Sequence, residues 1–260
     1  MTVAGGARTR KGPPPSGYFM KRTERRHLKE NELAHLAQSA RDALETRGSQ
    51  AWIVVAAVAA VLVVGLGYLA WRGSVQSRAN ALLAEALAIE GARVGPPPAP
   101  GSPSTGLSFI TEREKYQAAL TKFKVAADQY PSTDAGVFAR YRQATTYVAL
   151  GSLKEAVDTY QQVIDGAGSG LHGTMARLGQ AQAQARAGQF DPAITTFTAL
   201  SQDKEGPLPV DGILMQLGQT YLVAGKTADA QQTFNRLIAE FPESPFSGDA
   251  RRELDGLKKT

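Results

Sequence analysis

The chain has 260 residues, of which 43% are hydrophobic, and a formal net charge of +5. Residues 1–50 hold 10 Lys and Arg against 5 Asp and Glu, whereas the remaining residues balance at 19 against 19. This asymmetry indicates a basic segment that meets an anionic surface and argues against a basic domain that binds nucleic acid. Because the chain has no Cys, it has no disulfide framework, thiol nucleophile or lipidated Cys.

The N-terminal region divides into two predicted segments. Residues 1–21 are rich in Gly, Pro, Arg and Lys without an apolar period, which predicts a disordered basic tail. Residues 22–50 predict an amphipathic helix on the cytoplasmic side, because Leu33, Leu36 and Leu44 fall on one apolar stripe. Its basic residues either contact anionic lipid headgroups or belong to a solvated helical stalk, and the sequence leaves both open.

Residues 51–71 predict a single transmembrane helix. The run has 21 residues without a charge, and a helix of this length spans roughly 31 Å. Trp52 lies near one end, and Tyr68 and Trp71 lie near the other, as aromatic belts do at membrane interfaces. The run is long for a signal peptide and 50 residues precede it, which favours a signal anchor. The basic N-terminal segment favours a cytoplasmic N-terminus and a C-terminal domain on the other side of the membrane.

A 37-residue repeat follows the apolar run. The repeat places alanines at one position, aromatic residues four positions later, and glycines five positions before the last three alanines. These residues are Ala119, Ala156, Ala193 and Ala230; Phe123, Tyr160, Phe197 and Phe234; and Gly151, Gly188 and Gly225. Small residues allow two helices to approach closely, glycine permits a left-handed turn residue, and the aromatic ring fills the seam between hairpins.

With Gly218, Tyr221, Leu237 and Pro242, the last unit has the pattern of a tetratricopeptide repeat (TPR). The sequence therefore predicts an all-α protein: one transmembrane helix followed by an α-solenoid of about three and a half TPR hairpins over residues 74–260. The first hairpin is expected to begin with a helix at 74–94 and to cross a Pro-rich loop at 95–106. That loop is a surface loop or a polyproline ligand for another domain. A capping helix is expected at 245–257, and Ser152 with Glu155 predicts a capping box.

Protein binding is the predicted activity, on the groove lined by the first helix of each hairpin. The predicted partner-binding residues are Phe138, Tyr141, Thr145, Leu178, Gln182, Met215 and Gln219. We expect no enzyme activity, cofactor, metal site or small-molecule substrate. The only motif suggestive of a nucleotide is Gly168-x-Gly170-x-x-Gly173, which follows a predicted helix rather than the strand that a dinucleotide site requires.

The layout resembles the ancillary SecYEG translocon subunit (YfgM-like) family, on the segments 130–135 (YPSTDA) and 241–245 (FPESP). The resemblance implies a single-pass protein of the bacterial inner membrane, with a short cytoplasmic tail and one membrane helix. It also implies a periplasmic TPR domain that associates with SecYEG and with a periplasmic chaperone or foldase. The long basic tail and the Pro-rich insertion depart from that family. The alternative is a cell-envelope assembly or division scaffold of the TPR type.

Overall fold

The computed structural model describes residue 38 and residues 48–96 and 106–258. The predicted basic tail at 1–21 lies outside this part, as does most of the predicted amphipathic helix at 22–50. The chain divides into two compact units, Met1–Leu69 and Ala70–Thr260. In the described residues every element is helical except one pair of two-residue strands, which confirms the predicted all-α class.

The helix α2 (Gly48–Glu90) contains the predicted membrane segment. Its apolar side chains between Trp52 and Trp71 are all exposed; Val61, for example, is 71% exposed. Within the described residues α2 is the one helix long and apolar enough to cross a membrane, and its most apolar stretch buries none of its residues in the protein. A core helix of a soluble protein would bury such a stretch, because exposing it to water is unfavourable.

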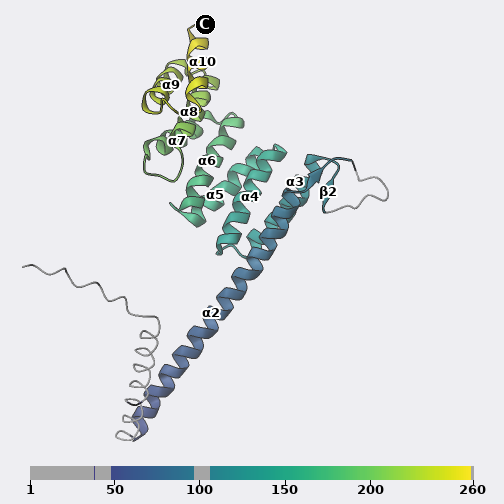
Figure 1. Ribbon diagram of the computed structural model, residues 1–260, viewed down its shortest axis with the longest axis vertical. Coiled ribbons are helices and arrows are strands. Elements are labelled where there is room, and N and C mark those ends of the chain that lie inside the picture. Colours follow the sequence, from purple (N-terminus) through teal and green to yellow (C-terminus); the bar gives the residue numbers. More distant parts are fainter. Residues whose placement is uncertain (1–37, 39–47, 97–105, 259–260) are drawn as a thin grey trace, which may run out of the picture. The chain divides into compact units, whose positions relative to one another are not determined.

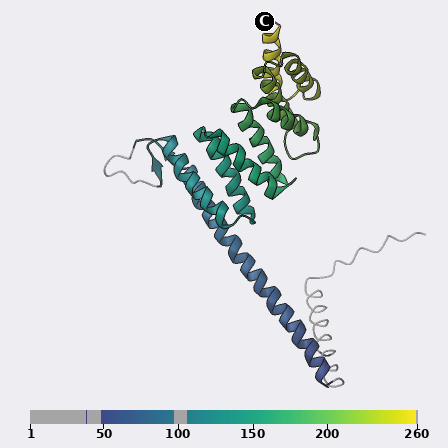
Figure 2. The same ribbon diagram turned by 180° about the vertical axis from the view of Figure 1, so that it is seen from behind.

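The second unit is a stack of antiparallel helices (Figures 1 and 2). Its helices are α3 (Glu112–Gln129), α4 (Asp134–Leu150), α5 (Leu153–Ala167), α6 (Leu171–Arg186), α7 (Phe190–Gln202), α8 (Val210–Val223), α9 (Thr227–Glu240) and α10 (Ser247–Leu257). Each of these helices packs against the next, and α4 also contacts α6. The pairs α4–α5, α6–α7 and α8–α9 are therefore the three full hairpins, and α10 packs on the last of them.

The residues at the repeated positions of the 37-residue period pack in the seams between the helices of this stack. The four repeat alanines are fully buried, and the aromatic residues Phe123, Tyr160, Phe197 and Phe234 are at most 3% exposed. The three repeat glycines each have the left-handed φ that the turn requires, between 74° and 79°. At Gly218 an added Cβ would lie only 2.4 Å from the Phe234 ring, so the helices approach as closely as the sequence predicts.

The last turns of α2 supply the first helix of the first hairpin. Ala86 and Ile89 of α2 are buried in one hydrophobic cluster with Phe123 of α3. Ion pairs join Glu85 to Lys122 and Glu90 to Arg142 of α4 across the same contact. This packing matches the expectation that the first repeat begins before the Pro-rich loop.

The end of that helix differs from the prediction. The helix stops at Glu90 rather than continuing to residue 94, because Arg93–Val94 form a strand, β1. This strand pairs in parallel with β2 (Ser108–Phe109), and Gly95 N–H donates to the Phe109 carbonyl at 3.0 Å. Backbone hydrogen bonds across the base of the loop therefore replace the last turn of the helix.

The predicted capping box at Ser152 is also wrong. Ser152 precedes α5 without a side-chain cap bond, and its ψ of 67° is not the extended conformation that directs a capping hydroxyl at the helix. Its N–H instead donates to the Tyr147 carbonyl at 2.9 Å in the turn that Gly151 permits. The capping box lies at α3, where Thr111 accepts from Glu114 N–H at 3.2 Å and Glu114 accepts from Thr111 N–H.

Candidate peptide-binding groove

The predicted groove residues lie on α4, α6 and α8, which are the first helices of the three full hairpins. Phe138, Tyr141 and Thr145 are on α4; Leu178 and Gln182 are on α6; Met215 and Gln219 are on α8. The structure places them in three different surroundings along the array: an aromatic cluster, the packed seams, and an open pocket.

The α4 residues belong to an aromatic cluster between hairpins. Phe138 stacks with Tyr141 at a centroid distance of 6.1 Å and meets the edge of His172 on α6 at 5.8 Å. Tyr141 in turn lies 5.8 Å from the Tyr160 ring, and burial raises the pKa values of both phenols. Phe138 and Tyr141 are half-buried, so each presents part of its ring to the surface. Thr145, also half-buried, donates its hydroxyl hydrogen to the Arg142 carbonyl at 2.8 Å.

Met215 and Leu178 pack mainly against hydrophobic clusters inside the array. Met215 is only 6% exposed and belongs to the cluster that includes Phe234 and Leu254 of α10. Leu178 is half-buried against the cluster around Phe197. Little of the Met215 side chain is therefore available to a partner, whereas its contacts stabilise the C-terminal end of the array.

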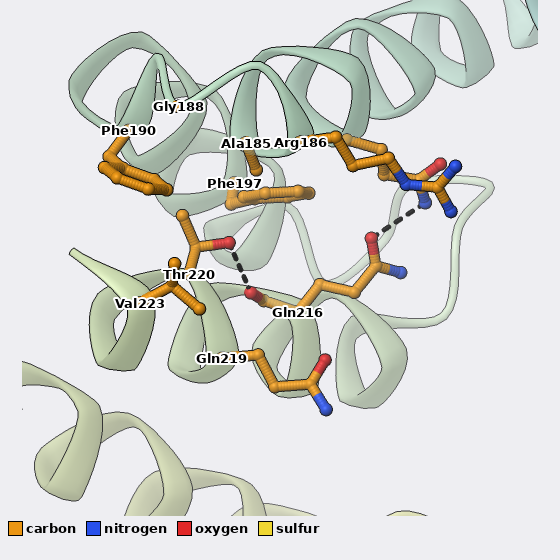
Figure 3. A pocket seen from close by; sticks show the side chains of 10 residues that line it. Ala185, Arg186, Gly188, Phe190, Phe197, Gln216, Gln219, Thr220 and Val223 are labelled. Carbon is orange, nitrogen blue, oxygen red and sulfur yellow. Dashed lines mark hydrogen bonds between the residues drawn. The ribbon is translucent and has the colours of Figure 1, made fainter. Parts of the chain in front are cut away.

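Gln182 and Gln219 line a pocket of about 580 Å³ formed by α6, α7 and α8 together with the turn that joins α6 to α7. Its lining residues are Gln182, Ala185, Arg186, Gly188, Phe190, Phe197, Gln216, Gln219, Thr220 and Val223. Gln182 Nε2 donates to Gln216 Oε1 at 2.7 Å, and the Thr220 hydroxyl donates to the Gln216 carbonyl at 2.7 Å (Figure 3). The polar ends of Arg186 and Gln216 gather on one side, and Phe190 and Val223 lie on the other.

Several residues that line the pocket were not among the predicted ones. The repeat register could have identified two of these, Arg186 and Val223. Gln182 and Gln219 occupy the same repeat position, 37 residues apart, and Arg186 and Val223 are another such pair four residues further on. One helical turn separates the two pairs, so they share a face of α6 and α8. The repeat register gave no signal for Gln216 and Phe190. These two residues line the pocket because neighbouring hairpins pack together there.

The lining of the pocket suits the binding of a ligand with both polar and apolar groups. It combines amides, one guanidinium and apolar walls, which suit a polar chain with an apolar side chain. In the described part of the chain no group of three His, Asp or Glu is placed to hold a metal ion. The Gly168–Gly173 motif spans the turn between α5 and α6 and the first residues of α6, and the helix α5 precedes it as predicted.

Comparison with known families agrees with this architecture. Residues 141–207 and 213–244 each match a tetratricopeptide repeat family. These segments cover α5, α6, α7 and α9 together with the greater part of α4 and of α8, which are the hairpins that carry the groove and the pocket. The chain is thus an all-α protein with a TPR-like solenoid, of the class whose domains bind protein partners.

Two similar solved structures share this fold at low sequence identity. The putative kinesin light chain of Podosopora anserina, with nearly identical TPR-like repeats, is 14% identical with a TM-score of 0.54, covering 71% of this chain and 87% of that one. A single-substitution variant of that protein is 15% identical with a TM-score of 0.54, over 71% and 86%. YrrB, a TPR protein with an unusual peptide-binding site, is 22% identical with a TM-score of 0.43, over 54% and 68%. Among curated proteins, none matches this chain.

Proposed function

We propose that this protein is a membrane-anchored TPR scaffold that binds protein partners on the outer, periplasmic side of a bacterial inner membrane. The observation that carries the proposal is the occurrence on one chain of an exposed apolar segment, residues 52–71, and an array of TPR hairpins with an open pocket. The segment has the length and composition of a membrane span, and the array has the surface of a binding module rather than of an enzyme.

Membrane insertion can be tested directly by fractionation. The full chain should remain in the membrane pellet after alkaline carbonate washing, because about 20 apolar residues in hydrocarbon are not released by disrupting electrostatic contacts. Release into the carbonate supernatant would contradict an inserted span. A variant with Val58 and Val61 changed to Lys is the matched control and should be released.

The orientation requires a separate test. Alkaline phosphatase fused after Thr260 should be active in a Gram-negative host, because the enzyme acquires its disulfides only outside the cytoplasm. An inactive fusion, expressed at a normal level, would reverse the proposed topology. The basic character of residues 1–50 supports the proposed orientation through the positive-inside rule.

We further propose that the partners are SecYEG and a periplasmic chaperone or foldase, on the basis of the family resemblance. A photo-crosslinking amino acid at Val61 would report neighbours of the membrane segment, and one at Val223 would report the occupant of the pocket. The proposal expects a translocon subunit at the first position and a chaperone, foldase or exported chain at the second. If envelope-assembly or division proteins crosslink instead, the chain is a scaffold of that alternative kind.

A further inference from the structure

We propose that the pocket formed by α6, α7 and α8 binds a carboxylate of an extended peptide segment, with an adjacent apolar side chain of the same segment against Phe190 and Val223. The inference rests on the proposed function and specifies the chemistry of the partner at one part of the groove. The carboxylate belongs either to an Asp or Glu side chain or to a C-terminus, and the experiment below distinguishes the two.

The charge of the pocket favours an anion. Arg186 is the only charged residue among those that line it. Arg186 is exposed, and within the described part of the chain its guanidinium has no hydrogen bond and no ion pair. In this pocket the guanidinium can therefore donate to a bound carboxylate without first breaking an internal salt bridge. Hydrogen bonds between two charged groups are stronger than neutral ones, and a guanidinium can form two to one carboxylate.

The glutamine amides that line the pocket supply further donors. Gln216 uses its carbonyl oxygen to accept from Gln182, so its own NH₂ group is not needed for that contact. Gln219 is exposed, and in the described residues its amide has no partner. The amide groups of Gln216 and Gln219 in the pocket lining can therefore donate to a carboxylate or pair with the backbone of an extended peptide.

The other side of the pocket is apolar and partly open. Val223 is 72% exposed, which is a high value for an apolar side chain beside a pocket. Phe190, which also lines the pocket, is half-buried. Covering such surface is favourable because it removes apolar area from water, so an apolar neighbour of the carboxylate adds affinity. A free small anion would not use this wall, whereas a peptide would.

The test uses the purified full chain in detergent and five labelled peptides, four of which form two matched pairs. One has the sequence SGSVDLVSGS with both ends blocked, and its counterpart replaces the Asp with Asn. The third peptide, SGSGSVNLV, ends in a free carboxylate, and the fourth is its C-terminal amide. Fluorescence anisotropy measures binding. We expect at least one carboxylate peptide to bind about tenfold more tightly than its neutral counterpart, because charge-assisted bonds contribute this much in partly exposed sites.

Variants of the chain locate the effect. Arg186→Gln should remove the preference for carboxylate, and Arg113→Gln on α3, an exposed arginine outside the pocket, should retain it. Arg186→Glu should invert the preference, so that the blocked peptide with Lys in place of Asp binds better than the Asp peptide. Because both substitutions are at an exposed position, the helical circular dichroism should not change.

The outcomes distinguish a failure of the carboxylate inference from a failure of the proposed scaffold function. An internal Asp preference assigns a side-chain carboxylate, and a preference for the free end assigns a C-terminus. If the peptides bind equally with and without a carboxylate, or if Arg186→Gln retains the preference, the inference is wrong while the scaffold function stands. If no peptide binds and no partner crosslinks at Val223, the inference and the proposed function fail together.

Discussion

The first and last hairpins of the array bury the same seam but connect their helices in different ways. Both place an alanine and a phenylalanine from the same repeat positions in a fully buried core: Ala119 with Phe123, and Ala230 with Phe234. In the last hairpin α8 and α9 are joined by a short turn at Gly225. In the first, α2 and α3 are separated by the Pro-rich segment, and the connection closes through β1 and β2. The seam and the turn are therefore separable parts of the repeat.

The largest expected effect tests whether the seam is equally important at both ends. Phe123→Ala and Phe234→Ala should each lower the free energy of unfolding by about 3–5 kcal/mol, because each removes a fully buried ring. Urea unfolding of the full chain in detergent, followed by circular dichroism, measures the loss. A much smaller loss for Phe123→Ala would mean that the first hairpin depends on its ion pairs instead of its seam.

The next prediction separates the turn from the seam. Gly225→Ala should lower the free energy of unfolding by about 1–2 kcal/mol, because an L side chain at its φ of 74° is strained. The matched control is Gly248→Ala in α10, where a Cβ has open space and helix propensity favours alanine. The control should raise stability slightly in the same urea experiment. Equal effects of the two substitutions would show that the turn glycine has no special role.

A smaller effect is expected at the start of the first hairpin's second helix. Thr111→Ala should lower the free energy of unfolding by about 1 kcal/mol, because the α3 capping box loses its side-chain acceptor. Ser152→Ala should have almost no effect, since Ser152 makes no cap bond. Thermal melts of both variants against the parent chain measure the difference. A loss at Ser152 as large as at Thr111 would contradict the assigned caps.

The smallest effect concerns pH dependence at the last hairpin. Hydrogen bonds from Arg236 and Lys204 lower the pKa of Glu240, so ionised Glu240 favours the folded state. This contribution is present above the ordinary carboxyl pKa and is lost as the pH falls through the lowered value. Glu240→Gln should therefore reduce the fall in melting temperature between about pH 6 and pH 3. Because the group is partly exposed, solvent screening keeps the effect small. An unchanged pH profile would show that Glu240 contributes nothing measurable.

Much of the fold could be predicted because its requirements are local and steric. A buried alanine, a left-handed glycine and an aromatic ring each leave a fixed position in a 37-residue period. The two cap positions were harder, since Thr111-x-x-Glu114 and Ser152-x-x-Glu155 have the same pattern. They differ because Ser152 directly follows the left-handed Gly151 and takes a non-extended ψ, whereas Thr111 has a ψ of 153°.

The site was less predictable because packing between hairpins decides which groove positions remain open. Met215 and Gln219 are one turn apart on α8, yet contacts with α9 and α10 bury Met215 and leave Gln219 exposed. The pocket also depends on Phe190 and Gln216, which lie off the predicted inward positions. The membrane topology and the SecYEG association stay predictions, because they concern surroundings rather than the fold of the chain.

The parallel pairing of β1 with β2 has a consequence for engineering the protein. Backbone hydrogen bonds hold Val94 and Phe109 side by side, so both ends of the intervening segment are fixed by the fold. Lengthening a segment with fixed ends adds little closure entropy, about 0.6 kcal/mol for each doubling. A fluorescent reporter or an affinity tag placed between these strands should therefore leave the groove intact, and it would give a label that occupies neither terminus of the chain.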